Sequence, residues 1–158
     1  YMGYIPQQDG LLEDLTVAQT LQYWQSLFEL SDEGVLEDAV QLMGLTPMFQ
    51  KRISQLSGGM KKRVSIALAL LNSPRILILD EVFSALDQKY CDALADYMKT
   101  FLIQGGSILY CSHNREELSA YCHRILVLKQ GTVTFYDDIQ ALPTDSTILN
   151  GLFFMDEP

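Results

Sequence analysis

Residues 76–81 restrict the possible folds of this chain more than any other segment. Four apolar residues lead directly into two carboxylates, Asp80 and Glu81. Buried parallel strands read as continuous apolar runs, and open α/β sheets bind ligands at the carboxyl ends of their strands. The segment therefore predicts a buried parallel strand that delivers two acids to a ligand site. One carboxylate can hold a divalent cation, and the other can act on water.

Apolar residues at helical spacing predict a series of helices around this strand. Thr16 and Gln19 form a capping-box pattern that opens the first helix, and Gly44 ends the second. Because residues 15–54 show only helical patterns, we expect them to form an all-helical insert. The expected helices span about residues 16–28, 33–43, 57–71 and 88–103, and another begins at a second capping pattern at residues 114–117.

Strand patterns alternate with these helices. Residues 75–80, 107–111 and 125–128 are the expected strands. Their alternation with helices implies one parallel sheet with right-handed crossovers. Gln130 and Gly131 then turn the chain into residues 132–136, which we expect to form an antiparallel hairpin at the sheet edge, before a short helix and a tail.

Composition limits the kinds of partner. With 158 residues and 48% hydrophobic content, the chain can build one core of ordinary domain size. Its formal charge of -9 opposes binding to nucleic acid or to an anionic lipid surface through a general basic field. Its apolar runs are far shorter than the roughly 20 residues that cross a bilayer. Three cysteines without a C-x-x-C pair indicate a reduced, cytosolic setting.

A second block, Leu-Ser-Gly-Gly-Met at residues 56–60, has the chemistry of an anion site. Ser57 can cap the helix that follows, and Gly58 and Gly59 leave the first backbone N–H groups of that helix unobstructed. A helix N-terminus offers unpaired N–H groups and partial positive charge, which together favour phosphate or carboxylate. The block therefore predicts a contact with an anionic group.

These two blocks, together with Cys-Ser-His at residues 111–113, resemble the ATP-binding cassette (ABC) ATPases that power ABC transporters. The resemblance covers essentially the whole chain. It implies an α/β fold with a P-loop NTPase-like parallel sheet core, an inserted all-helical subdomain and a C-terminal β-hairpin. The divisions that it implies are residues 1–10 as the Q-loop segment of the core, 11–55 as the helical subdomain, 56–138 as the signature helix and core, and 139–158 as a C-terminal tail.

The resemblance also assigns roles at the core of the site. Asp80, in the Walker B position, would bind Mg²⁺, and Glu81 would be the general base for the water that attacks the γ-phosphate of ATP. Gln7 would sense both the metal and that water, with Gln8 as the alternative by one residue. His113 would be the switch histidine that hydrogen-bonds the γ-phosphate and positions the catalytic carboxylate.

Other residues would serve a dimer. The resemblance implies that Ser57, Gly58 and Gly59 dock on ATP held by the second cassette of a head-to-tail pair. Asp87, in the D-loop block at residues 84–87, would couple the two sites. Two departures from the family pattern stand out, because Met60 replaces the usual glutamine and Val-Phe at residues 82–83 replaces the common Pro-Thr.

The expected function is therefore Mg-ATP hydrolysis that drives a transmembrane permease, at the cytoplasmic face of the cell membrane and without nucleic acid. The Ser-Gly-Gly-Met signature and the entry at residues 15–17 are more like multidrug or ABC-2-type exporters than like binding-protein-dependent importers. Two alternatives remain at this stage. One is an ABC ATPase of the repair or translation type, and the other is a cassette that acts only as an interaction module.

The 158 residues contain no G-x-x-x-x-G-K-[ST] phosphate-binding loop, the Walker A motif that holds the β- and γ-phosphates. The chain reads as the C-terminal two-thirds of a cassette. We therefore predict that the isolated chain binds ATP poorly and does not hydrolyse it at a useful rate. A phosphate-release assay with Mg²⁺ checks this, and appreciable turnover by the purified chain would refute it.

Overall fold

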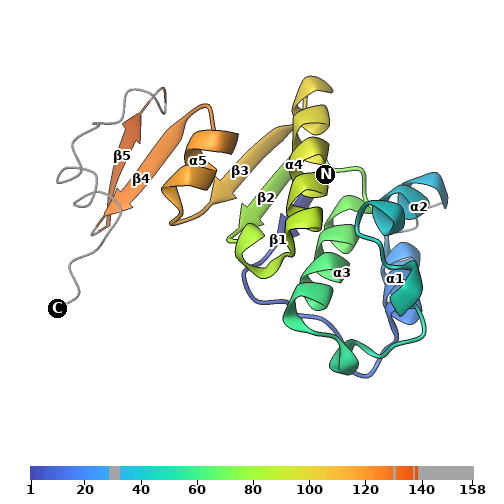
Figure 1. Cartoon of the computed structure of the whole chain (residues 1–158). Helices are drawn as coiled ribbons and strands as arrows, with labels where there is room; N and C mark the ends of the chain where they lie inside the picture. Colours follow the sequence, from blue (N-terminus) through green and yellow to red (C-terminus); the bar gives the residue numbers. More distant parts are fainter. Residues whose placement is uncertain (29–32, 130, 137, 139–158) are drawn as a thin grey trace, which may run out of the picture. The chain divides into compact units, whose positions relative to one another are not determined.

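The computed structural model describes residues 1–28, 33–129, 131–136 and 138 (Figure 1). The chain falls into two compact units, Tyr1–Cys111 and Ser112–Pro158. The boundary between them lies inside the predicted segment 56–138, so the four-part division drawn from the sequence remains a proposal. The helix and tail predicted after residue 138 lie outside the described residues.

A three-stranded parallel sheet forms the core of the first unit. Its order is β1 (Met2–Ile5), β2 (Ile76–Asp80) and β3 (Ser107–Cys111). Ile5 lies opposite Leu79, and Leu79 lies opposite Tyr110. The predicted strands β2 and β3 are confirmed. The sequence analysis did not predict β1, because four residues that include a glycine and precede Pro6 carry a weak strand signal.

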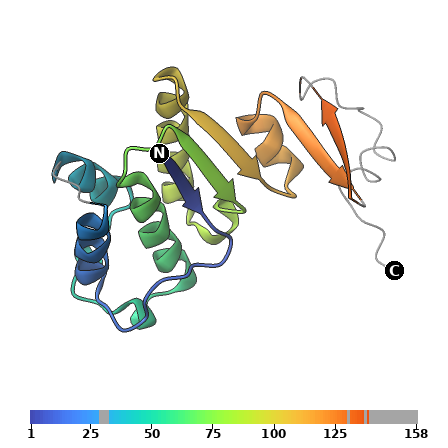
Figure 2. The same ribbon diagram turned by 180° about the vertical axis from the view of Figure 1, so that it is seen from behind.

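Helices α3 (Gly58–Leu70) and α4 (Gln88–Ile103) lie on one face of this sheet, as the two opposite views show (Figures 1 and 2). Leu77 and Leu79 of β2 are completely buried on the sheet. Met2, Tyr4 and Leu109 are instead 60%, 53% and 58% exposed, because successive strand residues point to opposite faces. Within the described part of the first unit, helices therefore cover one face of the sheet.

The predicted helical insert begins with α1 (Val17–Leu27) and α2 (Glu33–Leu42). The capping box at the start of α1 is confirmed, since Gln19 N–H donates to Thr16 Oγ1 and Thr16 N–H donates to Gln19 Oε1. Two short 3₁₀ turns, η1 (Thr46–Met48) and η2 (Ile53–Gln55), lead back to the core. Both α1 and α2 contact α3, so α3 joins the insert to the sheet.

Arg63 fastens α3 to the end of α2. Its guanidinium donates from Nε to the Met43 carbonyl at 2.7 Å and from Nη2 to the Gly44 carbonyl at 2.5 Å. It also lies 3.8 Å from the centre of the Tyr90 ring at the start of α4. Gly44 has φ +56°, and a Cβ there would lie 2.7 Å from the Tyr90 hydroxyl, so the glycine is needed both for its conformation and for its lack of a side chain.

The second unit contains α5 (Arg115–Tyr121), β4 (Ile125–Lys129) and β5 (Thr132–Tyr136). Asn114 caps α5, since its side chain accepts from the N–H groups of Glu116 and Glu117. The predicted return bond of the capping box is replaced, because the Asn114 N–H donates to Ser112 Oγ at 3.0 Å. Among the described residues no helix is long and apolar enough to cross a membrane.

The expected position of β4 needs correction. The sequence placed residues 125–128 in the same parallel sheet as the other strands, but β4 pairs antiparallel with β5 in a separate two-stranded sheet. The hairpin itself is confirmed, and it turns at Gly131, which has φ +75°. An apolar run does not specify its pairing partner, whereas the following turn favours the nearest strand.

We predict that Arg63→Met lowers the free energy of unfolding of the chain by about 2–3 kcal/mol, because the buried carbonyl of Met43 and the part-buried carbonyl of Gly44 lose a charged donor. Urea denaturation measures the change. Arg52→Met, at an exposed arginine, is the matched control and should cost no more than about 0.5 kcal/mol. Equal losses in the two variants would contradict the role given to Arg63.

Candidate active site

The turn after β2 presents Glu81 in an unusual conformation. Its φ is +48°, a region that residues other than glycine enter at a cost in free energy. Two hydrogen bonds hold it there: the Glu81 N–H donates to the Cys111 carbonyl at 2.9 Å, and Ser84 Oγ donates to the Glu81 carbonyl at 2.9 Å. The surrounding turn therefore fixes a carboxylate at the carboxyl end of the sheet.

Gln7 faces this carboxylate. Its Nε2 donates to Glu81 Oε2 at 2.8 Å. The contact follows from the sheet, because β1 and β2 run parallel and pair Ile5 with Leu79, so the residues that leave the two strands emerge at one edge. Of the two glutamines left open by the sequence, Gln7 is thus the one that this bond joins to Glu81.

Asp80 ends β2 next to Glu81 and pairs in register with Cys111. Burial, and then the charge of Asp80, raise the pKa of the Cys111 thiol above its usual value. The thiol therefore stays protonated at neutral pH and is a poor nucleophile or metal ligand. The Asp80 carboxylate and the Gln7 amide oxygen remain as the candidate metal ligands.

These two oxygen atoms are too few to hold a metal ion by themselves, but they suit Mg²⁺ that also binds water and phosphate. In the part of the chain that the structure describes, no group of three or more His, Cys, Asp or Glu side chains is arranged to hold a metal ion. Mg²⁺ prefers hard oxygen ligands and commonly uses one or two carboxylates, several waters and substrate phosphates. The donor set is therefore suited to a magnesium ion that arrives with a phosphate-bearing substrate.

The N-terminus of α3 carries the second group of predicted residues. Ser57 caps the helix by accepting from the Met60 N–H at 3.3 Å, and both Ser57 and Gly58 are exposed. A Cβ on Gly58 would meet nothing within 4 Å, whereas a Cβ on Gly59 would lie 2.7 Å from the Ala85 carbonyl oxygen. Gly59 therefore lets α3 approach the turn that follows Glu81.

Asp87 stands at the end of that turn. Between Glu81 and Asp87 the chain forms the 3₁₀ turn η3 (Phe83–Ala85), and Asp87 then occupies the N-cap position of α4. Its carboxylate makes no capping hydrogen bond, and the residue is exposed. The side chain is thus available for a role outside the helix, although the N-cap position alone would explain an aspartate there.

His113 belongs to the second unit, where it is exposed between β3 and α5. The structure therefore brings Gln7, Asp80 and Glu81 together at one sheet edge and links the helix start at Gly59 to the turn beside them. The role predicted for His113 remains a prediction. Lys62, a buried lysine that contacts the loop around Gln7, was not predicted. It lies between Lys61 and Arg63 in the sequence, and such a basic run gives no signal of burial.

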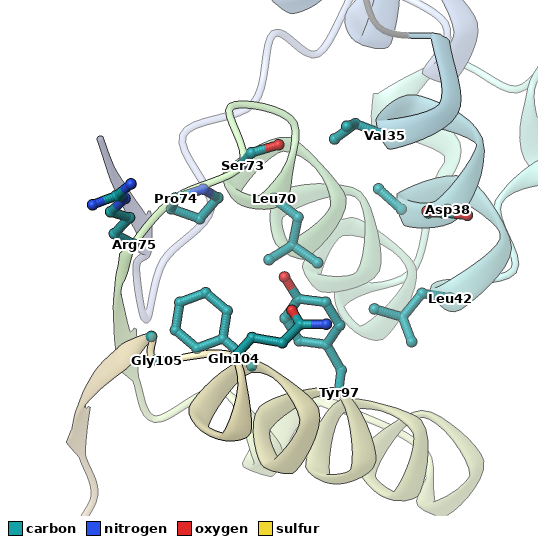
Figure 3. Close-up of a pocket in the computed structure, with 13 residues that line it drawn as sticks. Val35, Asp38, Leu42, Leu70, Ser73, Pro74, Arg75, Tyr97, Gln104 and Gly105 are labelled. Carbon is teal, nitrogen blue, oxygen red and sulfur yellow. The ribbon is translucent and has the colours of Figure 1, made fainter.

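A cavity of about 780 Å³ lies elsewhere in the first unit. Its walls come from α2, the loop before β2 and the end of α4, and Figure 3 shows Leu42, Leu70 and Tyr97 gathered around it. Burial raises the pKa of Tyr97, so its hydroxyl stays protonated. Because Arg75 borders the cavity just before β2 begins and Asp80 ends that strand, the cavity is separate from the carboxylates.

A family model, curated proteins and solved structures that resemble this chain all carry ABC transporter or ATP-binding descriptions. The family model described as ABC transporter matches residues 1–84. Nod factor export ATP-binding protein I of Rhizobium meliloti is 35% identical over 133 residues, which cover 82% of this chain and 40% of that protein. The linearmycin resistance ATP-binding protein LnrL of Bacillus subtilis (strain 168) is 31% identical over 133 residues, which cover 82% of this chain and 43% of that protein.

A solved structure described as the ATP binding subunit of an ABC transporter has a TM-score of 0.79 to this chain at 28% identity. The match covers 98% of this chain and 64% of that one. The chain thus spans about two-fifths of the length of the curated relatives and less than two-thirds of the solved structure. The similarity confirms the predicted P-loop NTPase-like α/β fold.

We predict that Gly59→Ala lowers the free energy of unfolding by about 1–3 kcal/mol, because the added methyl group would collide with the Ala85 carbonyl. Gly58→Ala is the matched control. Its methyl group would enter open space, so the free energy of unfolding should change by no more than about 1 kcal/mol. Urea denaturation of both variants checks the difference, and equal stability would contradict the close approach at Gly59.

Proposed function

The chain belongs to the ABC transporter family, whose model matches more than half of it, and on that premise we propose that it is part of a subunit that hydrolyses Mg-ATP to drive export. The observation that carries the proposal is the hydrogen bond between Gln7 and Glu81 beside Asp80 at the carboxyl edge of the sheet. The names of the relatives, which refer to Nod factor export and linearmycin resistance, support an exporter.

In the proposed reaction, Glu81 accepts a proton from the water that attacks the γ-phosphate of ATP. Gln7 orients that carboxylate through its amide N–H, which leaves its amide oxygen as a candidate metal ligand. Asp80 and this oxygen would hold Mg²⁺, directly or through water. The ion, when bound, neutralises charge that develops on the phosphate oxygens. The strained φ of Glu81 and the two bonds that fix its backbone support this role, since a general base must be held within reach of its water.

The exposed start of α3 supports a dimer as the working form. Ser57, Gly58 and Gly59 are proposed to bind the γ-phosphate of ATP that a second cassette holds in a head-to-tail arrangement. The open space beside Gly58 leaves room for a phosphate, and the helix N-terminus favours its charge. Asp87 is proposed to contact the second cassette, and His113 is proposed to hydrogen-bond the γ-phosphate.

A membrane permease is the proposed second partner, so the chain would act at the cytoplasmic face of the membrane. The helical segment 11–55 offers a contact surface at the end of α1. Tyr23 and Phe28 are 49% and 37% exposed, and both rings pack near Trp24. Both rings therefore remain partly exposed at the end of the helix. Exposed aromatic side chains are enriched in protein interfaces.

We predict that Glu81→Gln in the full-length, assembled protein leaves ATP binding intact and slows hydrolysis by a factor of roughly a hundred or more, because the amide cannot accept the proton. Equilibrium nucleotide binding and steady-state phosphate release measure the two effects separately. Glu37→Gln, at an exposed glutamate on α2, is the control and should turn over like the wild type. Wild-type turnover in Glu81→Gln would remove Glu81 from its proposed role.

A further inference from the structure

Lys62 is a buried cation in the middle of α3. Its side chain is 2% exposed, and its Nζ donates to the Pro6 carbonyl at 2.6 Å, the Gln7 carbonyl at 3.0 Å and Asp9 Oδ1 at 2.9 Å. A lysine ammonium has three N–H donors, and here three acceptors match them. Since a buried charge is costly unless it is paired and fully hydrogen-bonded, this arrangement needs all three contacts.

The three acceptors all belong to the loop that leaves β1. Lys62 binds the carbonyls of Pro6 and Gln7, and the carboxylate of Asp9 completes the set. The side chain of Gln7 points from this same loop to Glu81. A continuous series of contacts therefore runs from α3 through Lys62 to the loop backbone and from Gln7 to the carboxylate.

The neighbouring lysine, Lys61, forms a much more exposed ion pair than Lys62 does. Lys61 pairs with Glu13 at 2.7 Å, but their side chains are 24% and 55% exposed. The Asp9 carboxylate that faces Lys62 is only 11% exposed. Exposed ion pairs contribute little because water screens them, whereas a buried ammonium fixes the groups around it.

We propose that Lys62 is a positioning residue for ATP hydrolysis: it holds the loop of residues 6–9 so that Gln7 faces Glu81, and it couples that loop to the anion-binding start of α3. The inference rests on the function proposed above. Lys62 follows Ser57 by five residues on one rigid helix, a rise of roughly 7–8 Å. A displacement of α3 by an anion at Ser57 would therefore move the loop that carries Gln7.

A double-mutant cycle in the full-length, assembled protein tests the catalytic part. Lys62→Met should lower kcat by about 10- to 100-fold and change the KM for ATP by less than about threefold, because Gln7 is misplaced while the nucleotide contacts remain. In a Gln7→Ala background, Lys62→Met should cause no further loss of kcat, because Lys62 acts through Gln7.

Lys61→Met, the matched surface variant, should keep kcat within about twofold of the wild type. An equal loss from Lys62→Met with and without Gln7 would overturn the proposal, since a purely structural role acts independently of Gln7. Asp9→Asn keeps the shape of the side chain and removes its charge, and it should also lower kcat. This variant replaces Lys62→Met in the test if Lys62→Met does not fold.

A measurement without ATP separates this inference from the proposed function. Backbone ¹⁵N relaxation of the full-length protein without ATP should give order parameters of about 0.85 for residues 7–9 in the wild type and below about 0.6 in Lys62→Met or Asp9→Asn. Unchanged order parameters would overturn the role of Lys62. If the wild-type protein does not hydrolyse ATP, the proposed function fails, while this readout still decides whether Lys62 holds the loop.

Discussion

The parallel pairing of β1, β2 and β3 is the constraint on which the site depends. Because the three strands run in one direction, the residues that follow Ile5, Leu79 and Tyr110 meet at a single edge of the sheet. Residues separated by more than seventy positions, Gln7 and Glu81, can then share a hydrogen bond. An antiparallel arrangement of β1 and β2 would place Gln7 at the other end of β2 and leave the two acids without this partner.

Helix α3 connects this edge to the rest of the first unit. Two consecutive buried side chains reach in different directions: Lys62 binds the loop after β1, and Arg63 binds the end of α2. The helix start meets the turn after Glu81 through the close approach at Gly59. Movement of the loop after β1, of the end of α2 or of the turn after Glu81 would therefore displace α3. This linkage is the physical basis of the proposed coupling between the N-terminus of α3 and the carboxylate site.

Local signals explain what the sequence could predict. The capping residues Thr16 and Ser57 fixed the starts of α1 and α3, and the apolar run before Asp80 fixed β2. Features that depend on distant pairing were missed or misplaced, namely β1, the sheet to which β4 belongs, and the contacts of Lys62. A lysine in a sequence reads as a surface residue, and only the fold shows that carbonyl groups more than fifty positions away surround it.

Hydrolysis of Mg-ATP is proposed to take place at the carboxyl edge of the sheet beside Glu81. The most direct measurement is a structure of the full-length Glu81→Gln protein with Mg²⁺ and ATP. We expect Mg²⁺ in contact with Asp80 and Gln7, directly or through water, and residues 57–59 in contact with the γ-phosphate of a nucleotide that a second copy holds. A nucleotide bound away from this edge, with no metal near Asp80, would contradict the proposal.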